Sequence, residues 1–97
     1  MLDLPSDQLA MVREILAKHV PHAKVWAFGS RVLGTAQKFS DLDLAIEDEE
    51  ELSLVTMGNL RHAFSESDLP ILVDFLDMHT VKGTFRRIVE EQRVEII

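Results

Sequence analysis

The stretch FGSRVLGTAQKFSDLDLAI at residues 28–46 contains the residues that decide the predicted fold. An apolar run ends in Gly29-Ser30, a second glycine follows at Gly34, and Asp41 and Asp43 then alternate with apolar residues. This order predicts a buried strand, a tight turn into a short helical segment, and a second strand that carries two carboxylates.

The glycine-serine turn follows Val25–Phe28, a short apolar run that we expect to form the first strand. Gly29 has no side chain that could block a ligand, and it can adopt backbone angles that other residues avoid. Ser30 can cap the next turn with its hydroxyl, and it can also offer that hydroxyl and its N–H to an anion. Gly and Ser are also common in plain connections, so the pair alone leaves a structural role and a phosphate-binding role open.

The aspartate pair lies in a predicted strand, Asp41–Ile46. Side chains of a strand alternate between its faces, so Asp41 and Asp43 share one face and Leu42 and Leu44 share the other. Neighbouring carboxylates repel, which raises at least one pKa unless a cation relieves the charge. Hard cations such as Mg²⁺ prefer carboxylate oxygens. A divalent-metal site is therefore indicated, with a polar face on an exposed edge strand as the alternative.

A third carboxylate interrupts Ile71–Leu76, the most strand-like segment of the second half. An ionised side chain within such a run is costly unless it is paired or binds a metal ion. If this strand lies beside the Asp41–Ile46 strand, Asp74 can join the aspartate pair. Asp77 is the competing candidate, but it falls where the strand should end, so we expect it to cap a helix or to serve a loop.

The combined motifs resemble a known family. Gly-Ser-x3-Gly at 29–34, Ser-Asp-x-Asp-Leu at 40–44 and Val-Asp-Phe-Leu-Asp at 73–77 are similar to the minimal nucleotidyltransferases of the DNA polymerase β superfamily. The chain particularly resembles the small antitoxin-type subunits that pair with a helical partner of the HEPN type. The resemblance extends from the first expected helix to the last expected strand. It implies a polymerase β-like fold and a hetero-oligomer with that partner.

The resemblance also implies site roles. Asp41 and Asp43 would bind two metal ions, Mg²⁺ or alternatively Mn²⁺, and Asp74 would bind one of them and help to activate an acceptor hydroxyl. ATP would be the co-substrate and AMP the group transferred.

Phosphate binding follows from the same resemblance. Gly29 and Ser30 would hold the nucleotide phosphates. Many relatives carry a basic residue where Leu33 stands here, so Arg31 or Lys38 would have to supply positive charge, and Arg31 is the predicted nucleotide ligand.

Two further functions stay open at this point. One is a non-catalytic interaction module that only binds and neutralises its partner, and the other is a subunit of a small-molecule adenylyltransferase of the antibiotic-modifying kind. A serine hydrolase or a P-loop NTPase is disfavoured, because the chain has neither a Gly-x-Ser-x-Gly elbow nor a Gly-Lys-Ser/Thr sequence.

Composition is consistent with one small domain over residues 1–97. A formal net charge of −7 argues against stable, sequence-independent DNA binding, which needs a basic surface. The absence of cysteine excludes disulfides and thiolate metal sites. The N-terminal residues contain neither a basic leader nor a long apolar stretch, so a cytoplasmic protein without membrane insertion is expected.

The expected fold class is α/β or α+β, with a small mixed β-sheet flanked by helices. Helices are predicted where apolar residues recur at helical spacing, and Ser6 and Thr80 are the predicted caps of the first and last of them. The expected elements are a helix from Ser6 to about Val20, strand Val25–Phe28, a helical turn from Ser30 to about Leu33 closed near Gly34, strand Asp41–Ile46, a helix from about Leu52 to Ser65, strand Ile71–Leu76, a helix after Thr80 and strand Val94–Ile97.

Overall fold

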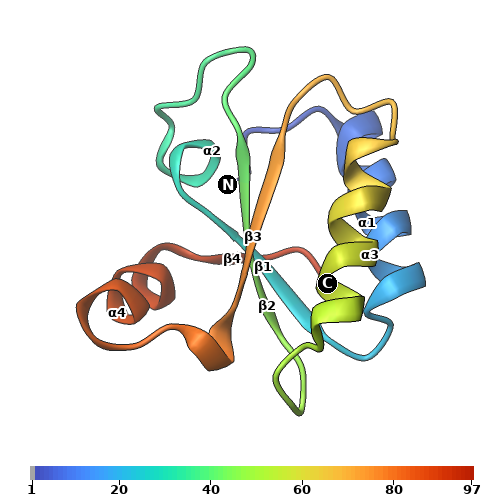
Figure 1. The fold of residues 1–97 in the computed structure, drawn as a ribbon. Coiled ribbons are helices and arrows are strands. Elements are labelled where there is room, and N and C mark those ends of the chain that lie inside the picture. Colours follow the sequence, from blue (N-terminus) through green and yellow to red (C-terminus); the bar gives the residue numbers. More distant parts are fainter. Residues whose placement is uncertain (1) are drawn as a thin grey trace.

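A computed structural model describes residues 2–97. Four strands form one sheet in the order β3-β2-β1-β4, and the helices lie on both of its faces (Figure 1). The elements in chain order are α1 (Ser6–His19), β1 (Lys24–Phe28), α2 (Ser30–Leu33), β2 (Leu42–Glu47), α3 (Leu54–Ser65), β3 (Val73–Asp77), the 3-10 turn η1 (Met78–Thr80), α4 (Gly83–Gln92) and β4 (Val94–Glu95).

The sheet is mixed. β1 pairs antiparallel with both β2 and β4, whereas β2 and β3 are parallel. Parallel neighbours require a crossover connection, and α3 supplies it. The predicted fold class, a small mixed sheet flanked by helices, is confirmed.

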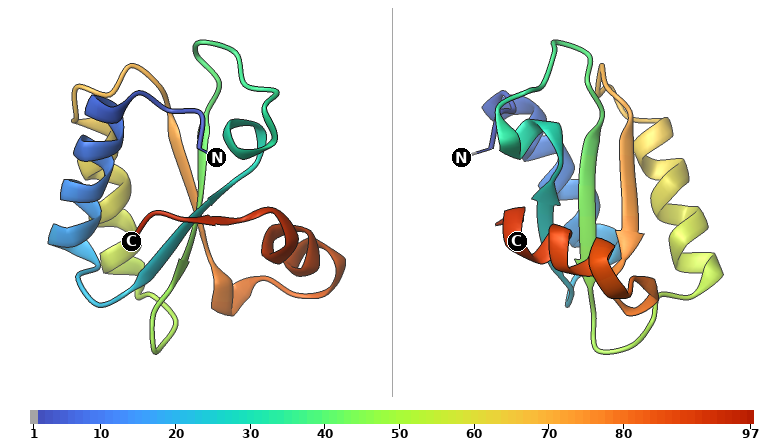
Figure 2. Two further views of the ribbon diagram at one scale, coloured as in Figure 1. Left: turned by 180° about the vertical axis from the view of Figure 1, so that it is seen from behind. Right: turned by 90° about the vertical axis from the view of Figure 1, so that its left-hand side faces the viewer.

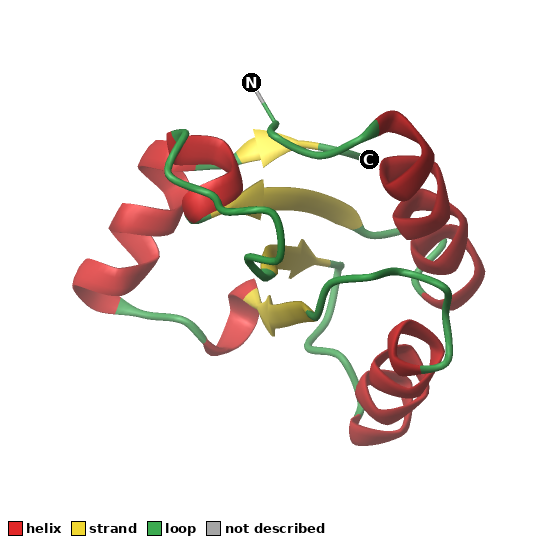
Figure 3. Ribbon diagram, turned by 90° about the horizontal axis from the view of Figure 1, so that it is seen from above, coloured by secondary structure: helices red, strands yellow, loops and turns green. Residues whose placement is uncertain are grey.

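The two faces of the sheet are covered differently. α1 and α3 lie side by side over one face, and α2 and α4 lie on the other side (Figures 1 and 2). The view along the sheet shows the strands between these two groups of helices (Figure 3). The pair α1 and α3 forms the larger layer, so the main core belongs to that face.

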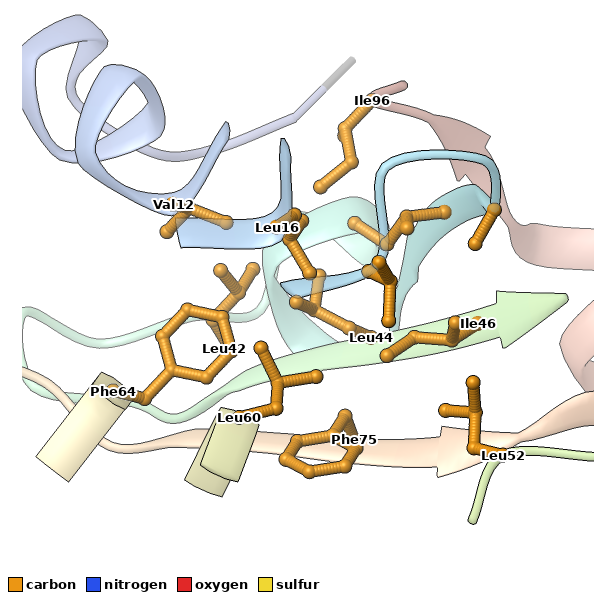
Figure 4. Packing of buried hydrophobic residues seen from close by; sticks show 14 of the residues in the cluster. Val12, Leu16, Leu42, Leu44, Ile46, Leu52, Leu60, Phe64, Phe75 and Ile96 are labelled. Atoms are coloured by element: carbon orange, nitrogen blue, oxygen red, sulfur yellow. The ribbon is translucent and has the colours of Figure 1, made fainter. Parts of the chain in front are cut away.

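The main core forms where alternate residues of β2 meet α1 and α3. Leu42, Leu44 and Ile46 are fully buried there, because every second side chain of the strand points to this face. They pack in one cluster with Val12 and Leu16 of α1, Leu60 and Phe64 of α3, and Phe75 of β3 (Figure 4).

Several predicted boundaries shift by one or two residues. β2 begins at Leu42, so Asp41 precedes the strand, and β3 covers Val73–Asp77 instead of 71–76. The terminal strand is only Val94–Glu95. The short helical turn Ser30–Leu33 with Gly34 as its left-handed C-cap is confirmed.

Two predicted helix caps are wrong. Ser6 is the first residue of α1, and Pro5 precedes it as a cap without a side-chain hydrogen bond. Thr80 lies in η1, while α4 begins at Gly83 after Lys82. A serine near an apolar stripe does not by itself reveal where helical backbone angles begin, because Ser also fits the first helical turn.

No helix within residues 2–97 combines the length and the apolar character needed to cross a membrane.

The core predicts a contrast between two leucines of α3. Leu60 is fully buried, whereas Leu54 is 88% exposed. Leu60→Ala should lower the free energy of unfolding by about 2–5 kcal/mol, because it removes buried methyl groups and leaves a cavity. Leu54→Ala is the matched control and should change it by less than about 0.5 kcal/mol. Urea denaturation measures both values, and equal losses would contradict this packing.

Candidate active site

On the sheet face opposite the main core, one residue from each of three neighbouring strands lies in a row. Phe28 of β1 pairs with Asp43 of β2, and Asp43 pairs with Asp74 of β3. Paired residues of neighbouring strands project from the same face at the spacing of adjacent strands, roughly 5 Å. Since β3 lies beside β2, the condition under which Asp74 was expected to join the aspartate pair is met, and Asp43 and Asp74 lie together.

Asp41 lies near the pair formed by Asp43 and Asp74, one residue before β2 begins. The first N–H of β2, that of Leu42, donates to the carbonyl of Leu72 at 3.0 Å. Asp41 and Asp74 are exposed, while Asp43 between them is half-buried. The three carboxylates thus lie near one another, at the end of β2 that faces the loop of residues 35–41.

Burial is the main cause that raises the pKa of Asp43 above its ordinary value of 3.8, and the negative charges of Asp74 and Asp41 raise it further. Within residues 2–97, no three His, Cys, Asp or Glu side chains are already gathered into a group that could hold a metal ion. Asp41, Asp43 and Asp74 therefore lie near one another without forming a preassembled group of metal ligands.

Gly29 brings the turn after β1 against Asp43. Its φ of 82° lies in the left-handed region, and a Cβ at this position would collide with Oδ2 of Asp43. Only glycine fits both constraints. Gly29 is also the N-cap of α2, so Ser30 is the first helical residue, and the prediction that the Ser30 hydroxyl caps the turn is wrong. The backbone places Ser30 directly after the contact with Asp43.

An aromatic wall completes the site. A cleft of about 190 Å³ runs beside the carboxylate pair, and its lining includes Phe28, Asp43, Asp74 and Phe85. Phe85 of α4 meets Phe28 edge to face, with ring centroids 6.3 Å apart. Phe85 is not among the site residues that the sequence predicted. Its place over the sheet depends on how α4 docks, which helical periodicity does not specify.

α4 is held over this face by one buried residue and by polar contacts. Val89 packs against Ala45 and Met78. Arg86 donates to the carbonyl of Met78 and pairs with Glu47 at 3.6 Å. These contacts hold α4 in place at one side of the cleft.

Arg31, the predicted phosphate ligand, is engaged elsewhere. Its side chain donates to the carbonyl oxygens of Ser40 at 2.9 Å, Asp3 at 2.9 Å and Lys38 at 3.2 Å, and the residue is only 4% exposed. A guanidinium carries five donors in a rigid fork, which suits several carbonyls at once. The placement does not support the prediction that Arg31 binds nucleotide. Arg31 instead ties the loop before Asp41 to the N-terminal segment.

Asp77 serves the loop and cap role that its position indicated. It is 1% exposed, and its carboxylate accepts hydrogen bonds from the N–H groups of Leu52 at 2.7 Å and His79 at 2.9 Å. It lies on the core side of the sheet, so it does not belong to the Asp41, Asp43 and Asp74 group.

Comparison with known proteins identifies the family to which the chain belongs. The polymerase beta nucleotidyltransferase family matches residues 11–97. The chain belongs to this family, and its class is therefore that of the nucleotidyltransferases. A relative from Haemophilus influenzae, described as a probable protein adenylyltransferase MntA, is 53% identical over 95 residues, which cover 98% of this chain and 83% of the relative. The predicted resemblance is confirmed.

Solved structures share the fold. A toxin–antitoxin crystal structure with AMP-PNP matches with a TM-score of 0.78 at 22% identity, covering 92% of this chain and 72% of the other. A tri-AMPylated HEPN toxin in complex with its MNT antitoxin from Shewanella oneidensis matches with a TM-score of 0.67 at 18% identity, over 93% of this chain and 69% of the other.

The raised pKa of Asp43 predicts how stability depends on pH. Between 3.8 and the raised value, the folded chain binds more protons than the unfolded chain, so the free energy of unfolding falls as pH rises through this window. In metal-free buffer, Asp43→Asn should be at least as stable as the wild type at pH 7 and should lose less stability above about pH 4. Urea denaturation at a series of pH values measures this, with the exposed Glu49→Gln as control. An Asp43→Asn variant that unfolds outright would show that the carboxylate is structural.

The hydrogen bonds of Arg31 predict a loss of stability on conservative replacement. Arg31→Lys keeps the charge but cannot reach the same carbonyls, so thermal unfolding should show a loss of about 1–3 kcal/mol. Lys38→Gln, which removes an exposed positive charge from the same loop, should change little. An Arg31→Lys variant of unchanged stability whose affinity for nucleotide falls would instead favour the phosphate-ligand role.

Proposed function

We propose that this chain is a metal-dependent adenylyltransferase that transfers AMP from ATP to a hydroxyl group of a helical partner protein of the HEPN type, and so acts as an antitoxin. The observation that carries the proposal is the carboxylate group formed by Asp43, Asp74 and Asp41 beside the Gly29 turn. The family of the chain and the described activity of its 53% identical relative support the same reaction.

The donor set fits a hard divalent cation. Asp43 lies between two other carboxylates that raise its pKa, and a cation would relieve this repulsion. We assign Asp41, Asp43 and Asp74 as the residues that would hold two Mg²⁺ ions, or Mn²⁺ in their place. When bound, such ions lower the pKa of an attacking hydroxyl and neutralise a departing pyrophosphate.

The residues of the chain position the reactants. The acceptor oxygen attacks the α-phosphorus of ATP, a new P–O bond forms, and the bond to the β-phosphate oxygen breaks with release of pyrophosphate. Asp74, exposed beside the cleft, accepts the proton of the hydroxyl. Gly29 has no side chain and so leaves room for the phosphates to approach the turn. Ser30 offers its N–H and hydroxyl to the β- and γ-phosphates, because the first N–H groups of a helix have no acceptor within it.

A protein acceptor suits the surroundings of the site. Phe85, which lines the cleft, is 51% exposed. Leu72, whose carbonyl accepts from the N–H of Leu42 directly after Asp41, is 73% exposed. Apolar side chains this open next to a functional group are typical of a surface that another macromolecule covers. They argue against a small, highly polar acceptor of the antibiotic kind, whose hydroxyl and amino groups would gain little from apolar contacts.

Replacement of each carboxylate tests the reaction. Asp41→Asn, Asp43→Asn and Asp74→Asn should each reduce Mg²⁺-dependent AMP transfer by about a thousandfold or more, because each keeps the side-chain shape but removes the charge that holds the ions. Ser30→Ala should cost roughly tenfold to a hundredfold, since backbone donors remain. Intact mass of both chains after incubation of the purified pair with ATP measures transfer.

The control is Glu49→Gln, which is exposed and distant from the row, whereas Asp77→Asn is unsuitable because Asp77 is a buried structural acceptor. If the wild-type pair shows no transfer and the three aspartate variants still neutralise the partner, the chain is a non-catalytic interaction module. Transfer to a small molecule but not to the partner would favour an antibiotic-type enzyme.

A further inference from the structure

The amide side chain of Gln92 reaches from the end of α4 to the turn at the site. Its Oε1 accepts a hydrogen bond from the N–H of Gly29 at 2.6 Å, across 63 residues of sequence. Gln92 is the last residue of α4 and is half-buried. The contact joins the helix that bounds the cleft to the glycine that lies against Asp43.

The pairing register of β1 and β4 explains why the Gly29 N–H donates to a side chain instead of to a backbone carbonyl. β1 and β4 pair through Trp26 with Glu95 and through Ala27 with Val94. Continued by two residues, past the end of β1 at Phe28, this register would place Gly29 opposite Gln92, but the backbone there belongs to α4 and has left the ladder. The side-chain oxygen of Gln92 takes the place that the carbonyl of a longer strand would occupy, so Gly29 is held as if the ladder continued.

The position of Gly29 is one that tolerates little movement. Its α-carbon lies so close to Asp43 that a Cβ would collide with Oδ2, and its φ of 82° is accessible to almost no other residue. Ser30 follows directly. Any displacement of Gly29 therefore changes the separation between the Ser30 turn and the carboxylates.

We propose that Gln92 is a positioning residue for nucleotidyl transfer, which fixes Gly29, and with it Ser30, relative to Asp43. The inference rests on the proposed function of the site. Gln92 itself touches neither nucleotide nor acceptor. Without the oxygen of Gln92, the Gly29 N–H loses its acceptor and the turn samples other positions. The groups of the turn that hold the phosphates are then misplaced relative to the carboxylates that hold the reacting end of the nucleotide.

A set of variants separates this role from a general structural one. Gln92→Leu keeps the size of the side chain but removes the acceptor, and Gln92→Asn keeps the amide but is too short to reach Gly29. Gln92→Glu keeps an acceptor oxygen at the same distance. The exposed neighbour Glu91→Gln is the matched control.

The first measurement needs no catalysis. Hydrogen exchange of the Gly29 amide, followed by NMR, should be slow in the wild type, Gln92→Glu and Glu91→Gln, and at least about tenfold faster in Gln92→Leu and Gln92→Asn. Unchanged protection in both acceptor-lacking variants would overturn the proposal. Because two such variants are used, failure of one to fold does not remove the test.

The second measurement is AMP transfer by the chain with its partner. In Gln92→Leu and Gln92→Asn, KM for ATP should rise about tenfold, while KM for the partner and the thermal midpoint stay near those of the wild type and of Glu91→Gln. An unchanged KM for ATP in variants that have lost Gly29 protection would overturn the proposal. If the wild type itself transfers no AMP, the proposed function fails, and loss of AMP-PNP affinity in the same variants then tests the positioning role separately.

Discussion

The alternation of side chains along β2 is the constraint on which both the core and the site depend. Its leucines and isoleucine fill the main core against α1 and α3, and the same pleat turns Asp43 to the opposite face. A register shift of one residue would bury the carboxylate and expose the apolar side chains, so the hydrophobic core strongly specifies the register. That register, in turn, sets Phe28, Asp43 and Asp74 side by side. Burial of apolar surface on one face thereby fixes polar geometry on the other.

The unequal covering of the two faces gives the site its character. One face is closed by two helices, whereas α4 covers part of the other through one buried valine, an arginine network and the Gln92 side chain. Asp41 and Asp74 at the open part are exposed to solvent, whereas Asp43 is buried enough that its pKa is raised. The same opening leaves Phe85 and Leu72 exposed beside the charges. Charged groups for metal and phosphate and an apolar border for a partner thus occupy one surface.

Buried polar groups in this chain mainly organise backbone. Arg31 gathers carbonyls of the loop before Asp41, and Asp77 gathers N–H groups of the segments that flank β3 and α3. Both have ionisable side chains that are almost wholly buried, and each of these side chains makes at least two hydrogen bonds to the main chain. An arginine next to a Gly-Ser turn and a second aspartate after Asp74 could each have been ligands by sequence position. Their side-chain contacts separate the structural residues from the candidate ligands.

The sequence by itself determined the order of the main helices and strands, the mixed α/β class, the short helical turn closed by Gly34 and the alternation that separates Asp43 from the leucines of β2. These follow from local rules, namely strand alternation, helical spacing and glycine geometry, which act over a few residues. Helix caps, the role of Arg31, the aromatic wall made by Phe85 and the bond from Gln92 to Gly29 were decided only by the tertiary structure. Each depends on which distant segments pack together, and contacts across tens of residues leave no periodic signal in the chain. Gln92 is the clearest case. Its contact with Gly29 depends both on the register between β1 and β4 and on the end of α4 at Gln92.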